Sequence, residues 1–321
     1  MKHIHIPETN ITIPRIAASF APAGSDYTDT HNYYLVDAYL ELGGTFLDTA
    51  NVYGRWFEQR LPVNELWLGR YFSERHNRHH FILDSKGGAL NPWDKSIPRI
   101  NSECLRHDLE NSLSNLHTDY LDYYWVHVDD PAVPAGEILE IMNQFKKEGK
   151  IRYFGCSNWS AERIREAMRY ADDKKITGFT AHQTMKNVAY PNMPAVLYDG
   201  MTYISSELEQ LHTNNQFPLF AYTAAARGYF SLADRTDFQT APQYRSCREL
   251  FDNNKSRERL TAIKKLAKET GWAYIYQLPY PSVPVIGVQS LRDIVNCLIA
   301  MELPIPTDFF EKIISKEVHH E

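Results

Sequence analysis

Short apolar runs alternate with helical patterns along almost the whole of this chain. The strand-like runs span residues 16–20, 45–47, 81–85, 120–126, 151–156, 178–182, 218–221 and 283–286. Strands that alternate with helices pair in parallel through right-handed crossovers. Eight such units predict a single closed α/β barrel, the (β/α)8 or TIM barrel, and 321 residues lie within the size range of that fold.

The helical patterns are clearest in three segments. Leucines recur on one helix face at positions 105, 109, 113 and 116. Apolar residues at 164, 167, 168 and 171 do the same, with Ser160 in the N-cap position. A third pattern uses positions 260, 263, 266 and 267, and Gly271 stands where a C-cap glycine is expected.

An N-terminal hairpin and one long connection complete the predicted domain. HIHIPETNITIP predicts two short strands around a turn at residues 8–10, a hairpin that would plug the bottom of the barrel. The longest connection, residues 228–254, is predicted to be a functional loop on the C-terminal face. Neither an internal repeat nor a low-complexity linker interrupts the pattern, so we expect one domain over residues 1–321.

Composition argues against several classes of protein. The formal net charge of −6 gives no reason to expect a nucleic-acid or anionic-membrane partner. No apolar run approaches the ~20 residues of a membrane span, and the N-terminus lacks the apolar core of a signal peptide. The four cysteines have neither zinc-site nor disulfide-scaffold spacing. We therefore expect a cytoplasmic protein without a bound metal, and the sequence does not indicate its oligomeric state.

Polar residues stand at or just after the ends of the predicted strands from the second to the eighth. In order they are Asp48, Lys86, His127, Ser157, Asn158, Gln183, Tyr222 and Gly287. Active sites of such barrels lie at the C-terminal ends of the strands. Asp48, Lys86 and His127 follow three consecutive strands, so the sequence predicts one pocket that holds an acid, a base and a histidine.

Several segments resemble signatures of one enzyme family. GGTFLDTANVYG at residues 43–54 is similar to the first signature of the aldo-keto reductases, and Glu65 and Gly69 in NELWLGR continue it. LRHDLENSLSNLHTDYLDYYWVH is similar to the second signature, and GKIRYFGCSNW to the segment that follows it. The chain thus resembles this family, in its bacterial NAD(P)H-dependent type, over nearly its whole length. The resemblance implies reduction of a carbonyl group by hydride transfer.

The resemblance also implies a role for each of four residues. Tyr53 would be the general acid, Lys86 the cation that lowers its pKa, Asp48 the partner of the lysine, and His127 the group that orients the carbonyl. A free tyrosine, with a pKa of about 10, is otherwise a weak acid at neutral pH. Other interpretations stay open: Asp48 and Lys86 can form a purely structural ion pair, and His127 can be a core residue.

The resemblance further implies an extended nicotinamide dinucleotide, NADP(H) or NAD(H), across the barrel mouth. Ser157, Asn158 and Gln183 match the positions that bind the carboxamide, although Asn158 can instead cap a helix, and Tyr222 matches the aromatic residue that stacks on the nicotinamide. The remaining candidate cofactor residues are Thr223, Arg227, Gly287, Gln289, Ser290, Arg292 and Asn296.

The adenosine end departs from the family pattern. Gln289 and Ser290 stand where the family commonly has a basic residue that binds the 2′-phosphate of NADP, and Cys297 aligns with an asparagine that often contacts adenine. Helix N-terminal amides near Ser290 still favour an anion. The family favours NADP, these positions weaken that preference, and both cofactors stay open.

Candidate substrate residues are Trp56, Trp93 and Asp129, with Asp130 and the 228–254 loop nearby. Flat apolar faces and hydroxyl acceptors suit a sugar or keto-sugar, and they suit a small aldehyde equally well. The sequence sets neither the direction of the reaction nor the substrate. Alternatives are a sugar or alcohol dehydrogenase, a cofactor-binding regulatory subunit with little turnover, or an isomerase or hydrolase on the same barrel. His76, His79 and His80 are interpreted as a solvated helix end rather than a metal site.

Overall fold

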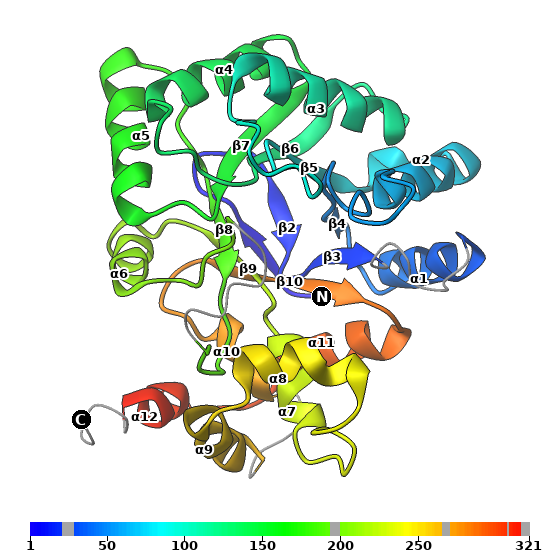
Figure 1. The fold of residues 1–321 in the computed structure, drawn as a ribbon, viewed down its shortest axis with the longest axis vertical. Coiled ribbons are helices and arrows are strands. Elements are labelled where there is room, and N and C mark those ends of the chain that lie inside the picture. Colours follow the sequence, from blue (N-terminus) through cyan, green and yellow to red (C-terminus); the bar gives the residue numbers. More distant parts are fainter. Residues whose placement is uncertain (21–28, 193–199, 265–269, 307, 316–321) are drawn as a thin grey trace.

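A closed parallel barrel forms the centre of the molecule. The computed structural model describes residues 1–20, 29–192, 200–264, 270–306 and 308–315. Around the barrel the strands follow the order β10-β3-β4-β5-β6-β7-β8-β9, and the helices surround them (Figure 1). Every neighbouring pair is parallel. The predicted (β/α)8 barrel is therefore confirmed.

The element bounds are as follows. The strands are β1 His3–His5, β2 Thr12–Pro14, β3 Ala17–Phe20, β4 Phe46–Leu47, β5 Ile82–Gly87, β6 Leu121–Val126, β7 Ile151–Ser157, β8 His182–Met185, β9 Leu219–Tyr222 and β10 Ser282–Val288. The α-helices are α1 Asp29–Glu41, α2 Val63–Arg75, α3 Ser102–Asn115, α4 Ala135–Lys147, α5 Ala161–Lys174, α6 Ser206–Asn215, α7 Tyr229–Leu232, α8 Arg245–Phe251, α9 Asn254–Ile263, α10 Thr270–Tyr276, α11 Leu291–Glu302 and α12 Phe309–Ser315. Short 3-10 turns are η1 Arg78–His80, η2 Ala226–Gly228 and η3 Pro242–Tyr244.

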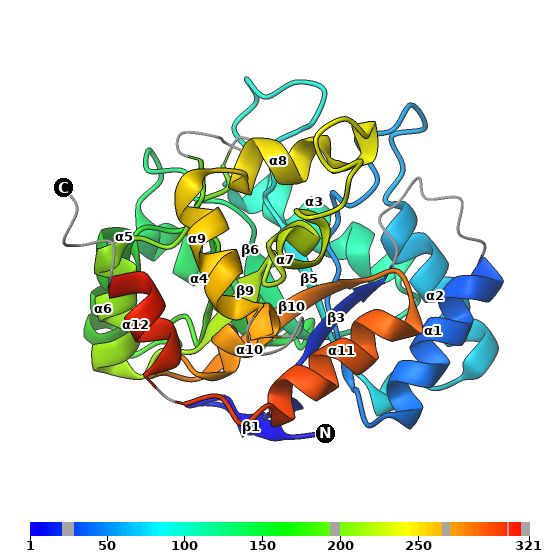
Figure 2. The ribbon, with the colours of Figure 1, turned by 90° about the horizontal axis from the view of Figure 1, so that it is seen from below.

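The N-terminal hairpin closes the bottom of the barrel, as predicted. β1 pairs antiparallel with β2. The side chains of Ile6, Ile11 and Ile13 are buried in one cluster with Phe46 and Phe220 from the barrel interior. Figure 2 shows β1 at one end of the molecule and α8 at the other. Because the hairpin occupies the N-terminal end of the barrel, the opposite end is left for the site.

Three strands differ from their predicted bounds by at least two residues at one end. β8 starts at His182, where the predicted run of 178–182 ends, because its pairing with β7 and β9 begins only there. β5 and β10 each run two residues beyond their predicted ends. Lys86, Gln183 and Gly287 consequently lie inside strands rather than after them.

The helices next to the mouth show why two of the signature residues are needed. The Glu65 carboxylate is buried and accepts hydrogen bonds from Ser85 Oγ at 2.6 Å and Asn115 Nδ2 at 2.9 Å. A Cβ atom at Gly69 would clash with the carbonyl oxygen of Asn115, so a glycine lets α2 lie against α3. These contacts fix both helices beside β5.

Two predictions about the C-terminal half are wrong. Residues 228–254 are not one irregular loop, because they contain α7 and α8. Gly271 is not a C-cap, because it lies within α10, while α9 ends at Ile263 with Lys264 in the C-cap position. The predicted helical positions 266 and 267 lie outside the described residues. Among the residues that the structure describes, no helix combines the length and the apolar character that crossing a membrane requires.

Candidate active site

A buried ion pair forms the floor of the mouth between β4 and β5. Lys86 Nζ donates to Asp48 Oδ1 at 2.7 Å and to the carbonyl oxygen of Thr49 at 2.6 Å. Asp48 directly follows β4, and its backbone N–H donates to the carbonyl of Ala18. The two side chains are 0% and 1% exposed. Removal of Lys86 would therefore leave the Asp48 carboxylate without its cation in a site that solvent does not reach.

A second carboxylate, which the sequence analysis missed, faces the same lysine. Asp84 Oδ1 lies 3.8 Å from Lys86 Nζ. Oδ1 also accepts the backbone N–H of Thr49 at 3.1 Å, and Oδ2 accepts the indole N–H of Trp125 at 2.8 Å. Burial and the neighbouring Asp48 raise the pKa of Asp84, while Lys86 opposes them. The i, i+2 spacing of Asp84 and Lys86 along one strand puts both on the same face, and this signal was readable from sequence.

Tyr53 and His127 meet above this floor. Lys86 Nζ lies 5.1 Å from the centre of the Tyr53 ring. The rings of Tyr53 and His127 are 6.0 Å apart at an interplanar angle of 70°. His127 directly follows β6, where its backbone N–H donates to the carbonyl of Gly87 at 2.9 Å. Asp48, Tyr53, Lys86 and His127 thus come together from the ends of three neighbouring strands.

Burial dominates the protonation of this cluster. It raises the pKa of the Tyr53 hydroxyl to about 12, although the Lys86 ammonium acts in the opposite direction. Lys86 thus acts on the pKa of Tyr53 in the direction that the family resemblance implies, but burial outweighs it. Burial, together with Lys86, lowers the pKa of His127 to about 3, so the imidazole is neutral. Within the described residues, the buried Nδ1 atom of His127 has no hydrogen-bond partner.

Gln183, predicted to contact the cofactor, belongs to the same cluster. Its side chain is buried in β8, and Nε2 donates to Asp48 Oδ1 at 3.0 Å. Asp48 Oδ1 thus accepts from Lys86 and from Gln183. The floor of the mouth and the predicted carboxamide contacts are therefore joined through Asp48.

Asn158 is already bonded to its neighbours in the protein. Its Nδ2 donates to Ser157 Oγ and to the carbonyl of His127, both at 3.0 Å. Its Oδ1 accepts the hydroxyl of Tyr222 at 2.6 Å and the backbone N–H of Thr202 at 3.1 Å. Asn158 has a positive φ of 63° and is not the N-cap of α5.

The segment after β9 turns sharply. Thr223, Ala226 and Arg227 have positive φ values of 56°, 49° and 53°. The guanidinium of Arg227 is exposed and donates to Ser246 Oγ in α8 at 2.8 Å. Arg227 is thereby held against α8, and Thr223 contributes its carbonyl oxygen to a hydrogen bond from Ala226.

At the start of α11 a carboxylate occupies the exposed helix cap. Asp293 Oδ2 accepts the backbone N–H groups of Gln289 at 3.0 Å and Ser290 at 2.8 Å, and the Ser290 hydroxyl at 3.0 Å. The Asp293 carboxylate thus already places a negative charge at the helix N-terminus, where the sequence favoured an external anion. Arg292 is exposed and Asn296 is half-buried one turn later.

Gly287 in β10 and Cys297 in α11 differ in their exposure to solvent. Gly287 is exposed, and none of the described atoms lies within 4 Å of the place where a Cβ atom would stand. Cys297, at the position of the family asparagine, is buried against Tyr276, so it belongs to the core. Open space at the mouth therefore lies over Gly287 and not beside Cys297.

The three candidate substrate residues have different surroundings. Trp56 and Trp93 are 44% and 46% exposed, and the Trp56 ring lies 6.1 Å from that of Tyr53. Asp129, by contrast, accepts Arg163 Nε at 2.9 Å and Arg163 Nη2 at 3.1 Å. Both oxygens of the Asp129 carboxylate are engaged by Arg163, which leaves this carboxylate less available to a substrate hydroxyl.

The histidines before β5 lie far from this site. His76 and His79 line a hollow of about 600 Å3 together with His117, on the side where β5 and β6 begin. None of the four clustered residues lines this hollow. In the described part of the chain, no three His, Cys, Asp or Glu side chains are grouped so as to hold a metal ion.

Comparisons with known proteins point to one family. The sequence profile described as "Aldo/keto reductase family" matches residues 17–317. Aldo-keto reductase YhdN of Bacillus subtilis (strain 168) is 33% identical over 168 residues, which are 51% of this chain and 49% of that protein. Norsolorinic acid reductase B of Aspergillus parasiticus is 29% identical over 180 residues, 53% of this chain and 46% of that protein. The matched part thus spans about half the length of each of these two relatives.

The fold agrees with the sequence comparison. The crystal structure of a thermostable aldo-keto reductase with the inhibitor epalrestat superposes with a TM-score of 0.71 at 20% identity, over 98% of this chain and 99% of that one. At this identity the match speaks for the fold alone. Since the family profile covers nearly the whole chain, this protein belongs to the aldo/keto reductase family.

Proposed function

We propose that this protein is a nicotinamide-dinucleotide-dependent carbonyl reductase that converts an aldehyde, ketone or keto-sugar to the alcohol. The observation that carries the proposal is the buried pair of Lys86 and Asp48, 2.7 Å apart, beside the ring of Tyr53. A purely structural ion pair has no need of a tyrosine and a neutral histidine converging on it. Together these groups supply a proton donor and a hydrogen-bond donor for one carbonyl oxygen.

In the proposed reaction a bound reduced nicotinamide would supply the hydride ion for the carbonyl carbon and would itself be oxidised. The carbonyl oxygen accepts the proton of the Tyr53 hydroxyl. Lys86 stabilises the phenolate left on Tyr53, and Asp48 and Thr49 hold the Lys86 ammonium in place. Neutral His127 donates a ring N–H to the same oxygen as negative charge develops there. Tyr53 then regains a proton from solvent.

The residues from β7 to β10 fit a nicotinamide dinucleotide. Ser157 and Gln183 carry the hydroxyl and amide groups that a carboxamide would bind, and Gln183 is fixed by Asp48. Asn158 would have to exchange its bond with Tyr222 for one to the ligand. The open space over Gly287 allows close approach of a flat or extended group. Stacking on Tyr222 would set which face of the nicotinamide meets the substrate.

We infer that NAD(H) is used at least as well as NADP(H). A 2′-phosphate at the start of α11 would lie near the Asp293 carboxylate, which already accepts the donors of Gln289 and Ser290. Like charges at close range are unfavourable, whereas the ribose 2′-hydroxyl of NAD is neutral. Exposed Arg292 is the nearest cation in the same helical turn that could offset this repulsion.

The proposal is tested by following the oxidation of NADH and of NADPH with a panel of aldehydes, ketones and keto-sugars. Turnover with at least one carbonyl is expected, with NADH at least matching NADPH in kcat/KM. The reverse assay with sugars and simple alcohols separates a reductase from a dehydrogenase. Dinucleotide binding without turnover in either direction would favour a regulatory subunit. Absence of any dinucleotide binding would overturn the proposal.

A further inference from the structure

A cavity of about 210 Å3 opens beside the catalytic cluster, between the connections β4–α2 and β5–α3 and helix α3. Its walls are rich in cationic side chains. The lining includes Arg55, Arg60, Trp93, Arg99, His107 and Lys86.

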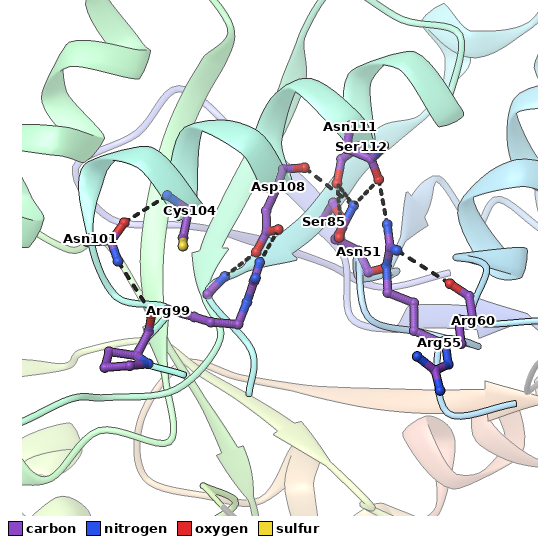
Figure 3. A network of polar contacts seen from close by, with 12 residues as sticks. Asn51, Arg55, Arg60, Ser85, Arg99, Asn101, Cys104, Asp108, Asn111 and Ser112 are labelled. Atoms are coloured by element: carbon purple, nitrogen blue, oxygen red, sulfur yellow. Dashed lines mark hydrogen bonds and ion pairs between the residues drawn. The ribbon is translucent and has the colours of Figure 1, made fainter. Parts of the chain in front are cut away.

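Arg55 is held rigidly by neutral acceptors. Its Nε donates to the carbonyl of Asn51 at 2.8 Å, and its Nη2 donates to Asn111 Oδ1 at 2.6 Å (Figure 3). Nη1 reaches the carbonyl of Arg60 at 3.5 Å. Among the described residues no carboxylate oxygen lies within 4.0 Å of this guanidinium. Its position is therefore fixed while its charge remains without a direct counter-ion.

Arg60 is the second cation of the cavity. Its guanidinium lies 4.3 Å from the centre of the Trp93 ring, and the Trp93 indole N–H donates to the carbonyl of Arg55 at 2.6 Å. The side chain is exposed, and it too forms no ion pair with a described carboxylate. Stacking on Trp93 orders the guanidinium edge and leaves its N–H groups available to a ligand.

The acidic groups nearby do not cancel these charges. Asp108, the one carboxylate in the described lining, pairs with Arg99 and accepts the backbone N–H of Gly88 at 2.9 Å. Glu65 lies behind the layer formed by Asn51, whose Nδ2 donates to it at 3.3 Å. Burial raises the pKa of Glu65, and Arg55 lowers it. Arg55 and Arg60 thus leave an excess of positive charge in the cavity.

The position of the cavity suits a substrate rather than the dinucleotide. The candidate cofactor residues lie on β7 to β10, whereas β4 and β5 stand on the other side of the closed barrel. The cavity includes Val52, next to the proposed acid Tyr53, and Lys86 of the catalytic floor. A group bound there would lie beside the proposed catalytic residues.

We propose that this cavity binds the anionic group of the substrate, a carboxylate or a phosphate, so that the enzyme prefers carbonyl compounds that carry an acidic group. The inference rests on the proposed carbonyl reductase function. Two guanidinium groups, one locked by Asn51 and Asn111 and one stacked on Trp93, would form charge-assisted hydrogen bonds with the anion. Arginines of this kind recognise carboxylates and phosphates in preference to neutral groups.

The test compares matched substrates in the wild type and in Arg60→Gln. 4-Oxobutanoate is paired with its methyl ester, and glyceraldehyde 3-phosphate with glyceraldehyde, so that the carboxylate and the phosphate are judged separately. The wild type is expected to prefer at least one anionic member by about tenfold or more in kcat/KM. Arg60→Gln should reduce that preference about tenfold through KM and leave the neutral member within about twofold. Arg169→Gln, which removes an exposed arginine on α5, is the control and should change neither.

Each outcome decides the inference. Turnover of the neutral members without any preference for the charged ones, or a preference that survives in Arg60→Gln, would overturn the anion site and leave the proposed function standing. If no aldehyde is reduced with either dinucleotide, the proposed function fails, and calorimetric titration with succinate and with inorganic phosphate decides for the cavity. Binding of either probe that is weakened in Arg60→Gln supports the anion site. Absent binding, or equal binding by both proteins, overturns it.

Discussion

The two ends of the candidate site are built in different ways. At β4 to β6 the side chains of Asp48, Asp84 and Lys86 are almost fully buried and bonded to one another. At the start of α11 the cap formed by Ser290 and Asp293 lies near the surface, and its bonds to other described residues stay within its own turn. A change of charge in the first region calls for a compensating change at its buried partner. In the second region a residue can be substituted without affecting contacts outside the turn. On the proposed function, the buried barrel residues would carry the chemistry, and a surface turn would decide the choice of cofactor.

The largest expected effect comes from Lys86→Met in the buried region. We expect a loss of turnover of about 10³-fold, within the usual range for a positioned acid–base system. The free energy of unfolding should fall by about 3–5 kcal/mol, because Asp48 is left buried without its cation. Urea denaturation and steady-state kinetics measure the two effects.

A double variant separates stability from catalysis in this pair. Lys86→Met with Asp48→Asn removes both charges, so much of the lost stability should return while activity does not. Equal stability losses in the single and double variants would contradict the view that the unpaired Asp48 charge is the cause.

Gln289→Arg should have an intermediate effect confined to the α11 end. An arginine there can pair with a 2′-phosphate, so we expect NADPH to bind about tenfold more tightly and NADH to be little changed. Dissociation constants from fluorescence titration measure this. An equal change in the dissociation constants of both dinucleotides would show that this turn does not distinguish the 2′-phosphate from the 2′-hydroxyl.

Asp84→Asn probes the buried region with a smaller change. The negative charge of Asp84 raises the pKa of Tyr53, so its removal should lower that pKa. Alcohol oxidation, which needs the Tyr53 phenolate, should then rise at a lower pH than in the wild type. Asp172→Asn, at an exposed residue, serves as the control. An unshifted pH profile of alcohol oxidation in Asp84→Asn would show that Asp84 does not influence the pKa of Tyr53.

The smallest expected effect is that of pH on the reduction itself. Reduction needs protonated Tyr53, whose pKa is raised to about 12, and neutral His127, whose pKa is lowered to about 3. Both values lie outside pH 6–9, so kcat for reduction should vary by no more than about twofold across that range. A titration of kcat inside this window would contradict the shifted pKa values of Tyr53 and His127.

The barrel and the position of its mouth could be predicted because they follow from local pattern. Buried strands that end in polar residues identify the floor of the mouth without any knowledge of contacts, as for Asp48 and His127. Asp84 was missed because it lies inside an apolar run, although its spacing from Lys86 was informative. The serine at 290 and the acid at 293 form a capping-box pattern that could also have been read.

Other features depend on contacts between distant parts of the chain. Asp129 pairs with Arg163, which lies 34 residues away along the chain. No local sequence pattern predicts this bond. The raised pKa of Tyr53 reflects burial outweighing Lys86, a balance that only the packed structure determines. The start of β8 at His182 likewise depends on its pairing with β7 and β9.

Single-turnover kinetics of Tyr53→Phe, measured together with dinucleotide binding, test the central claim most directly. The account predicts that hydride transfer slows by about 10³-fold while the dissociation constant of NADH stays within about twofold. Tyr34→Phe, at a tyrosine that is 56% exposed, is the control and should behave as the wild type. Hydride transfer at a wild-type rate in Tyr53→Phe, with NADH bound, would contradict the assignment of Tyr53 as the proton donor.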